Sequence, residues 1–266
     1  MNAVSAEPRN LRPHSDSVRA SCLVVIPALN KQETIVGVVN DLRRRGFQRI
    51  RVIDNGSTDR TAEYARAAGA EVHNEPHCGY GRACQRGLSN IPRGIAWILF
   101  CDGDGSDDFD DVDLMIETAE RGADLILTNR FATKSGREAM TLMQRFGNQL
   151  IVRLNQLGWK FRFTDFGPLR LIRRESLDDI AMRERGFGWN VVMQIRAVEA
   201  GLTIAQVPAR YRPRQGGRSK ISGNLLAAVC AGIGMLPGLA RLYFGALRFG
   251  VPAEAPGRET HRPASG

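Results

Sequence analysis

Short apolar runs alternate with amphipathic segments from about residue 21 to residue 130, and this alternation limits the fold more than any other feature of the chain. The runs are nearly continuous in Val, Ile and Leu, which is typical of parallel strands buried on both faces. The segments between them place apolar residues at helical spacing, and Gly46, Gly69 and Gly122 follow as candidate helix caps. This order predicts an α/β fold in which helices flank an open, mostly parallel, Rossmann-like sheet. The expected strands are 22–29, 50–54, 95–101 and 125–128, and the expected helices are 34–45, 61–68, 81–88 and 112–121.

The rhythm changes after residue 130. A helix, a short pair of strands, a second helix and a final strand are expected there, at 140–157, 161–165 with 169–172, 190–200 and 203–211. A basic segment, 212–220, follows the last strand. We therefore expect one large domain over residues 21–223.

The two ends of the chain differ from this domain in composition. Residues 1–20 and 251–266 are polar, contain prolines and lack periodicity, so we expect a disordered leader and a disordered tail. The leader lacks the apolar core of a signal peptide. Residues 224–250 predict an amphipathic or apolar C-terminal helical segment, but their uncharged part, 224–240, is shorter than the roughly 20 residues that span a bilayer. This segment is expected either on a membrane surface or partner subunit, or packed against the protein's own core.

The net charge narrows the class of partner without choosing one. It is +9, from 37 basic and 28 acidic side chains, which suits a nucleotide diphosphate, an anionic membrane surface or nucleic acid. The basic residues are scattered and lack interleaved aromatic residues, so no nucleic acid partner is expected. The five cysteines contain no CxxC pair, which argues against a disulfide framework or zinc site and favours the reducing cytoplasm. The composition predicts no oligomeric state.

Polar loops follow three of the expected strands, at 27–30, 54–59 and 102–108. In open α/β sheets, ligands bind beyond the carboxyl ends of the strands. Three such loops at one edge of a sheet therefore predict a binding site, although any one of them alone would be weak evidence.

Asp102 and Asp104 are the most informative residues of these loops. They directly follow a buried strand, repel each other and have no cationic neighbour in sequence. Mg²⁺ or Mn²⁺ would remove this repulsion, since these cations take one or two protein carboxylates and complete their shell with phosphate oxygens and water. A solvated turn with capping aspartates is the alternative, and it accounts for Asp107 or Asp111 better than for Asp102. An EF-hand calcium site is excluded because no Glu stands at the required distance and a strand precedes the loop.

Several short motifs, informative mainly as a set, stand in a fixed order along the chain. They are VVIPALN at 24–30, VIDNGSTD at 52–59, GYGRA at 79–83, DGD at 102–104 and VPARYRPRQGGRSK at 207–220. Together, over roughly residues 23–223, they resemble family 2 glycosyltransferases of the GT-A fold. Within that family the chain is most similar to dolichyl-phosphate mannose synthases and bacterial polyprenyl-phosphate glycosyltransferases.

This resemblance implies a metal-dependent, inverting glycosyltransferase with Mg²⁺ or Mn²⁺ as cofactor. The donor would be a UDP- or GDP-sugar, and the acceptor a polyprenyl phosphate. The enzyme would be cytoplasmic, with a peripheral position on the cytoplasmic face of the membrane. A lipid phosphate is already an anion and needs no general base, whereas the hydroxyl acceptor of a soluble transferase would need one, for which Asp165 is the first candidate.

The resemblance also implies roles for individual residues. The base and ribose would be cradled by Pro27, Leu29, Ile53 and Asn55. The ribose, metal and diphosphate would face Asp102, Gly103 and Asp104, of which the two aspartates would bind the metal. The sugar, the acceptor or their phosphates would be contacted by Arg130, Asp165, Arg214 and Lys220, the last two on a mobile loop.

Three positions depart from the family pattern. Asn55 and Val192 stand where an acidic residue and a Glu are common, and Lys31 stands where an acidic residue commonly follows the Asn. The changes at Asn55 and Lys31 leave the nucleotide base open. Together, the three keep open a third possibility, a nucleotide-sugar-binding protein without activity.

Overall fold

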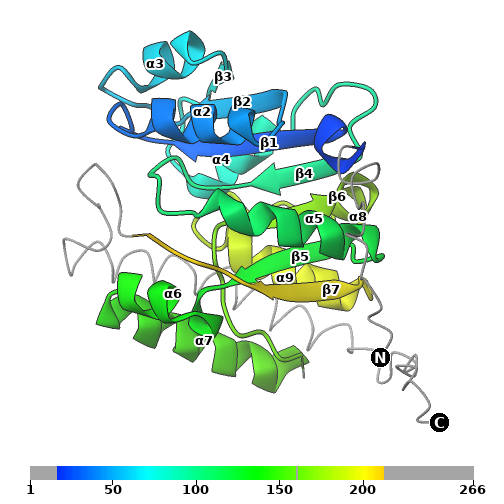
Figure 1. Cartoon of the computed structure of the whole chain (residues 1–266). Coiled ribbons are helices and arrows are strands. Elements are labelled where there is room, and N and C mark those ends of the chain that lie inside the picture. Colours follow the sequence, from blue (N-terminus) through cyan, green and yellow to red (C-terminus); the bar gives the residue numbers. More distant parts are fainter. Residues whose placement is uncertain (1–16, 160, 213–266) are drawn as a thin grey trace, which may run out of the picture.

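One seven-stranded sheet runs through the part of the chain that the computed structural model describes, residues 17–159 and 161–212 (Figure 1). The strand order is β3-β2-β1-β4-β6-β5-β7. β6 pairs antiparallel with β4 and β5, and the other neighbours pair in parallel. The predicted α/β fold with an open, mostly parallel sheet is therefore confirmed. The strands are β1 (Cys22–Ala28), β2 (Arg49–Asp54), β3 (Glu71–Asn74), β4 (Trp97–Phe100), β5 (Leu125–Asn129), β6 (Arg170–Arg173) and β7 (Ile204–Pro208).

Helices cover both faces of the sheet and separate two apolar cores. Because side chains alternate between the faces along a strand, Val24 and Ile26 of β1 pack on one side and Leu23 and Val25 on the other. The first side lies under α2, α3 and α5, and the second under α4, α8 and α9 (Figure 1). These helices are α2 (Ile35–Arg44), α3 (Thr61–Ala67), α4 (Tyr80–Gly87), α5 (Val112–Glu120), α8 (Arg174–Asp179) and α9 (Trp189–Glu199), and two 3-10 turns are η1 (Phe109–Asp111) and η2 (Arg130–Ala132).

Two further helices, α6 (Lys134–Ala139) and α7 (Leu142–Trp159), follow β5. α7 packs on α9, where Trp159 meets Val191 and Ile195 in a small apolar cluster. The Trp159 indole N–H donates to Glu199 Oε1 at 2.9 Å. One side of α7 is thus held to the domain, while its other side faces outward (Figure 1).

The strand expected at residues 161–165 is absent, so that prediction was wrong. Phe161 and Phe163 pack into the core beneath α9, as a strand would allow. The backbone, however, bonds to one side chain instead of a neighbouring strand. Gln206 Oε1 accepts from the Thr164 N–H at 2.9 Å, and Gln206 Nε2 donates to the Arg162 carbonyl at 3.0 Å.

Short polar elements were not predicted. β3 is an edge strand whose side chains are partly or fully exposed, so it lacks the apolar run by which the other strands were identified. α6 and α8 have six residues each, which is too short for helical periodicity to be evident.

The ends of the folded part differ slightly from the expected domain limits. Residues 17–20 form a helical turn and Val18 is buried, so folded structure begins before residue 21. The expected helical segment 224–250, the tail 251–266 and most of the leader lie outside the described residues. Within the described part of the chain, no helix is both long and apolar enough to cross a bilayer.

Candidate functional site

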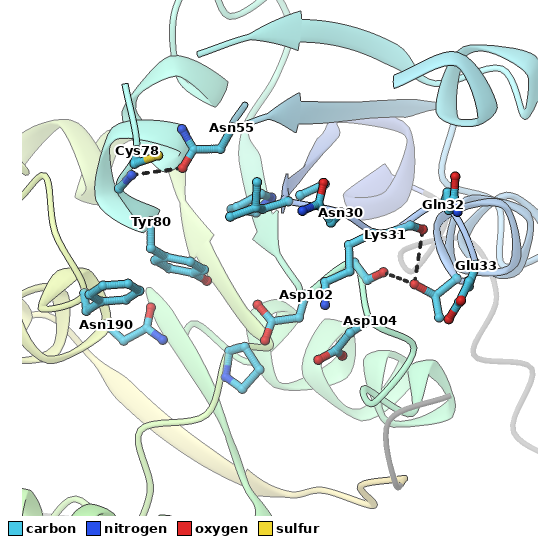
Figure 2. A pocket seen from close by; sticks show the side chains of 18 of the residues that line it. Asn30, Lys31, Gln32, Glu33, Asn55, Cys78, Tyr80, Asp102, Asp104 and Asn190 are labelled. Carbon is cyan, nitrogen blue, oxygen red and sulfur yellow. Dashed lines mark hydrogen bonds between the residues drawn. The ribbon is translucent and has the colours of Figure 1, made fainter. Parts of the chain in front are cut away.

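A cavity of 870 Å³ opens at the carboxyl ends of β1, β2, β4 and β5 (Figure 2). Its walls come from the loops after these strands, from the first turns of α4 and α9, and from Tyr211 beyond β7. The three polar loops that the sequence singled out therefore contribute to one cavity at one edge of the sheet.

Hydrogen bonds join the loops after β1 and β2 into one wall. Asn30 has a left-handed φ of 53°; its N–H donates to Ser57 Oγ at 3.0 Å, and its Oδ1 accepts from the Thr58 N–H at 2.8 Å. The next N–H, of Lys31, donates to Thr61 Oγ1 at 2.7 Å. The Lys31 side chain lines the cavity beside Asp102 and Asp104 in Figure 2.

The loop after β4 presents Asp102, Gly103 and Asp104 to the cavity. The Asp102 N–H donates to Asp107 Oδ2 at 3.0 Å, and the Ser106 N–H donates to Asp104 Oδ1 at 3.1 Å. These bonds fix the backbone of the loop at Asp102 and hold the Asp104 carboxylate in place.

This loop concentrates negative charge. Burial and the neighbouring Asp102 carboxylate raise the pKa of Asp107 well above its usual range. Within the described ranges, no group of three or more His, Cys, Asp or Glu side chains could hold a metal ion. Asp102 and Asp104 alone still fit Mg²⁺ or Mn²⁺, because these cations commonly use one or two protein carboxylates and complete their shell with phosphate oxygens and water.

Arg130 lines the cavity and is held by a buried ion pair with Asp165. Arg130 Nε and its backbone N–H both donate to Asp165 Oδ2 at 2.8 Å, and its terminal nitrogen donates to Oδ1 at 2.8 Å. Burial alone would lower the pKa of Arg130, but the Asp165 carboxylate outweighs burial and raises it. The guanidinium carbon also lies 5.0 Å from the centre of the Tyr211 ring. A permanent positive charge is thus fixed on the cavity wall.

Asp165 itself is 1 % exposed and is not part of the cavity wall. Its carboxylate accepts from Arg130 and from the Phe166 N–H. The expectation that Asp165 points towards the sugar or acceptor therefore needs correction, since this carboxylate holds Arg130 in place.

The residues expected to cradle the base and ribose divide into two groups. Pro27 and Leu29 line the cavity, as does Gly103 of the neighbouring loop. Ile53 does not: it is fully buried in the core beneath α4, because it lies on the face of β2 that turns towards that helix. Val192, noted as a departure from the family pattern, is also buried and away from the cavity wall.

Asn55 lines the cavity, but its amide is used to shape the wall. Asn55 Nδ2 donates to the carbonyls of Glu75 and His77 at 3.0 and 2.8 Å, and its Oδ1 accepts from the Gly79 N–H at 3.0 Å. The Asn55 amide thus supports the loop after β3, and its contact with a base or ribose stays a prediction.

Arg214 and Lys220 lie outside the described residues. The residues just before them are at the cavity rim. The Arg212 N–H donates to the Ser106 carbonyl at 2.9 Å, and Tyr211 lines the cavity.

The sequence did not identify several residues of the cavity wall. Tyr80 and Tyr211 each had a signal, since both lie within quoted motifs, at 79–83 and 207–220. The others come from two separate segments and show no local pattern; they are Gln144, Phe187 and Asn190.

Comparison with known proteins gives concordant matches. Residues 23–181 match the family model described as Glycosyl transferase family 2. An uncharacterized glycosyltransferase of Mycobacterium tuberculosis is 32% identical over 217 residues, 78% of this chain and 93% of the relative. A dolichyl-phosphate hexose transferase of Haloferax volcanii is 31% identical over 196 residues, 73% of this chain and 83% of the relative. The structure of glucosyl-3-phosphoglycerate synthase from Mycobacterium tuberculosis with Mn²⁺, UDP and glucosyl-3-phosphoglycerate has a TM-score of 0.68 at 21% identity, covering 94% of this chain and 88% of that chain.

Proposed function

Because the chain belongs to glycosyl transferase family 2, we propose that it transfers a sugar from a nucleotide-sugar donor to the phosphate of a polyprenyl-phosphate lipid. Membership makes the chain a glycosyltransferase of the GT-A fold. The observation that carries the lipid acceptor is an exposed apolar face on α7, a helix that borders the cavity.

The donor would bind along the loops after β1, β2 and β4. A UDP- or GDP-sugar would place its nucleoside near Pro27, Leu29 and Lys31, and its diphosphate near Asp102 and Asp104. The Mn²⁺ and UDP in the structure of glucosyl-3-phosphoglycerate synthase, which shares this fold, support the same class of ligand here.

Mg²⁺ or Mn²⁺ would be held by Asp102 and Asp104. When bound, it would neutralise charge on the departing diphosphate. Arg130 supplies a second, permanent positive charge on the same wall, and Asp165 fixes its direction. We expect Arg214 and Lys220 to add phosphate contacts.

The reaction would be a single displacement with inversion. An oxygen of the lipid phosphate attacks the anomeric carbon as the bond from that carbon to the diphosphate breaks, and the nucleoside diphosphate leaves with the bonding electrons. The attacking oxygen is already anionic, so no proton has to be removed. This agrees with the burial of Asp165, which leaves that carboxylate engaged with Arg130.

α7 has the features of a helix that lies in a membrane surface. Of the eight exposed large apolar side chains among the described residues, five are on α7: Leu142, Met143, Phe146, Leu150 and Leu157. At 3.6 residues per turn they fall within an arc of about 100°. That arc is opposite the side on which Asn148, Val152, Asn155 and Trp159 are buried.

The charge beside this face suits an anionic lipid surface. α7 contains Arg145 and Arg153 and no acidic residue, and Lys134 and Arg137 of α6 are countered only by Glu138. Around the helix, Arg153 lies within the apolar arc and Arg145 about 60° outside it. Basic residues close to an apolar face are typical of interfacial helices. Gln144 lines the cavity from the opposite side of the same helix, so a membrane on the apolar face would hold lipid headgroups about one helix diameter from the site. The enzyme would then be peripheral on the cytoplasmic face.

A transfer assay tests the acceptor. The full chain would be incubated with Mn²⁺ and radiolabelled UDP-glucose or GDP-mannose, with polyprenyl phosphate in vesicles as one acceptor and 3-phosphoglycerate as the other. Label in the organic phase, dependent on polyprenyl phosphate, is the expected result. Label on 3-phosphoglycerate alone would replace the lipid acceptor with a soluble one. If a panel of nucleotide sugars gave neither transfer nor hydrolysis of the donor, the result would favour a protein without activity.

Vesicle sedimentation tests α7. The double change Leu142→Ser and Phe146→Ser should reduce binding to anionic vesicles severalfold, because it removes two side chains that are 81% and 70% exposed. Leu114→Ser, at an exposed site on α5, is the matched control and should bind as the unchanged protein does. Equal binding of all three proteins would refute the role of α7.

A further inference from the structure

Two polar groups of the cavity wall lack a strong hydrogen-bond partner in the part of the chain that the structure describes. The Tyr80 hydroxyl and Asn190 Oδ1 are both buried atoms; Asn190 Oδ1 has no partner among the described residues, and the Tyr80 hydroxyl has only the Cys84 thiol beside it. Tyr80 is the first residue of α4, and Asn190 lies in the first turn of α9. Figure 2 places both on one side of the cavity, with Asp102 across from the Tyr80 ring.

A buried polar atom without a partner costs about 1–3 kcal/mol, so such atoms in a cavity wall point to a ligand. Other protein groups nearby do not meet this need. The Cys84 thiol next to Tyr80 is only a weak hydrogen-bonding group. Arg170, buried behind the wall, donates to the backbone carbonyl of Asn190 at 3.3 Å and leaves Oδ1 unused.

Close backbone packing fixes the two residues relative to each other. The N–H groups of Gly81 and Arg82 donate to the carbonyls of Gly186 and Arg185 at 2.9 and 3.0 Å, which joins the start of α4 to the segment before α9. A Cβ on Gly81 would stand 2.5 Å from the Glu184 carbonyl oxygen. The backbone of this wall is thus held in place, and only the side chains of Tyr80 and Asn190 need to turn for their polar atoms to meet a ligand.

The chemistry of these atoms limits what they can bind. Asn190 Oδ1 is an acceptor, so its partner must carry a hydrogen. A diphosphate oxygen carries none, whereas a sugar hydroxyl both donates and accepts. The phenol of Tyr80, whose pKa is raised by burial, stays protonated. It can therefore either donate a hydrogen bond to a second sugar hydroxyl or accept one from it.

We infer that Tyr80 and Asn190 form a subsite that holds two ring hydroxyls of the donor's sugar. This inference rests on the proposed function, since it requires a nucleotide-sugar donor with its diphosphate at Asp102 and Asp104. The subsite distinguishes sugars by the positions of their hydroxyl groups, because a donor that lacks one of them leaves a buried protein group unpaired.

Calorimetric titration in Mn²⁺ tests the subsite with a nucleoside diphosphate and its nucleotide sugar, either UDP with UDP-glucose or GDP with GDP-mannose. Tyr80→Phe and Asn190→Leu each remove the polar group and keep similar bulk. Each should weaken the nucleotide sugar about tenfold and leave the affinity for the nucleoside diphosphate within about twofold. The unchanged diphosphate affinity also shows that the variants fold. Tyr64→Phe, which removes a hydroxyl on α3 away from the cavity, should change neither affinity.

The outcomes distinguish failure of the proposed function from failure of the sugar subsite alone. If the unchanged protein binds no nucleoside diphosphate and no nucleotide sugar, the proposed function fails, and the subsite fails with it. If it binds both, but Tyr80→Phe and Asn190→Leu bind the nucleotide sugar as tightly as it does, only the subsite is refuted. An equal loss for both ligands also refutes it, since the residues would then contact the nucleotide.

Discussion

The buried ion pair of Arg130 and Asp165 gives a sharp test of how the cavity wall is built. Asp165→Asn removes the negative charge but keeps one oxygen that can accept from the Arg130 backbone N–H. The Asp165 side chain is fully buried and the Arg130 side chain is 10% exposed. The guanidinium would therefore lose its bidentate partner on its buried side, where Asp165 is closed to water.

The expected loss of stability is large. Breaking a buried ion pair from one side costs about 3–5 kcal/mol, and the remaining amide oxygen keeps part of the hydrogen bonding. We therefore expect Asp165→Asn to lower the free energy of unfolding by about 3 kcal/mol, and Arg130→Met by a similar amount. The double variant has no unpaired charge, so it should be about 2 kcal/mol more stable than the sum of the two losses predicts.

Urea unfolding followed by tryptophan fluorescence measures these differences. Trp97, Trp159 and Trp189 are all buried, so their emission should change on unfolding. If the two losses add within about 0.5 kcal/mol, Arg130 and Asp165 are not coupled as described. Asp165 would then return as a candidate general base for a hydroxyl acceptor.

Three further changes test neighbouring parts of the site. Asp107→Asn removes a carboxyl whose folded-state pKa is raised by burial. Such a group lowers the free energy of unfolding as pH rises from 3.8 towards its folded pKa, so the variant should gain about 1 kcal/mol over the unchanged protein across that range. A difference in unfolding free energy that stays constant with pH, measured by chemical unfolding, would contradict this. Gly81→Ala should lower the free energy of unfolding by at least about 2 kcal/mol, because the new Cβ would meet the Glu184 carbonyl. Gly147→Ala, where a Cβ has open space, is the control and should not lower it. Equal unfolding midpoints for the two variants would refute the packing argument. The exposed Cys78 thiol on the cavity wall should react more slowly with a maleimide when Mn²⁺ and UDP or GDP are present. Equal labelling of the Cys78 peptide with and without nucleotide, measured by mass spectrometry, would show that the nucleotide does not bind beside Cys78.

The sheet and the acidic loop were predictable because their signals are local. A strand buried on both faces is a continuous apolar run, as in β1 and β4, and Asp102 directly follows such a run. Because the strands are parallel, their carboxyl ends lie at the same edge of the sheet, so no further information is needed to bring their loops together. Ile53 shows the limit of motif reasoning: it belongs to a family motif, yet the two-residue period of β2 turns it into the core.

Features that depend on distant residues were not predictable. Asp165 pairs with Arg130, which lies 35 positions away in the sequence. Gln206 bonds to the backbone of residues 162 and 164, more than 40 positions away, where a neighbouring strand was expected. The family resemblance implied a nucleotide contact for Asn55, and nothing in its own segment indicates the loop at 75–79 that takes its hydrogen bonds. Tyr80 and Asn190 likewise line the same cavity only because α4 and the segment before α9 pack together.

The central claim is that Asp102 and Asp104 hold a divalent cation together with the donor diphosphate. Calorimetric titration of UDP and GDP, in Mn²⁺ and in EDTA, tests it in the unchanged protein, in Asp102→Asn and in Asp104→Asn, with Asp113→Asn on α5 as an acidic control outside the cavity. We predict binding that requires Mn²⁺, that weakens at least about tenfold in both cavity variants and that is unchanged in the control. Binding of equal affinity in EDTA, or in either cavity variant, would contradict the claim.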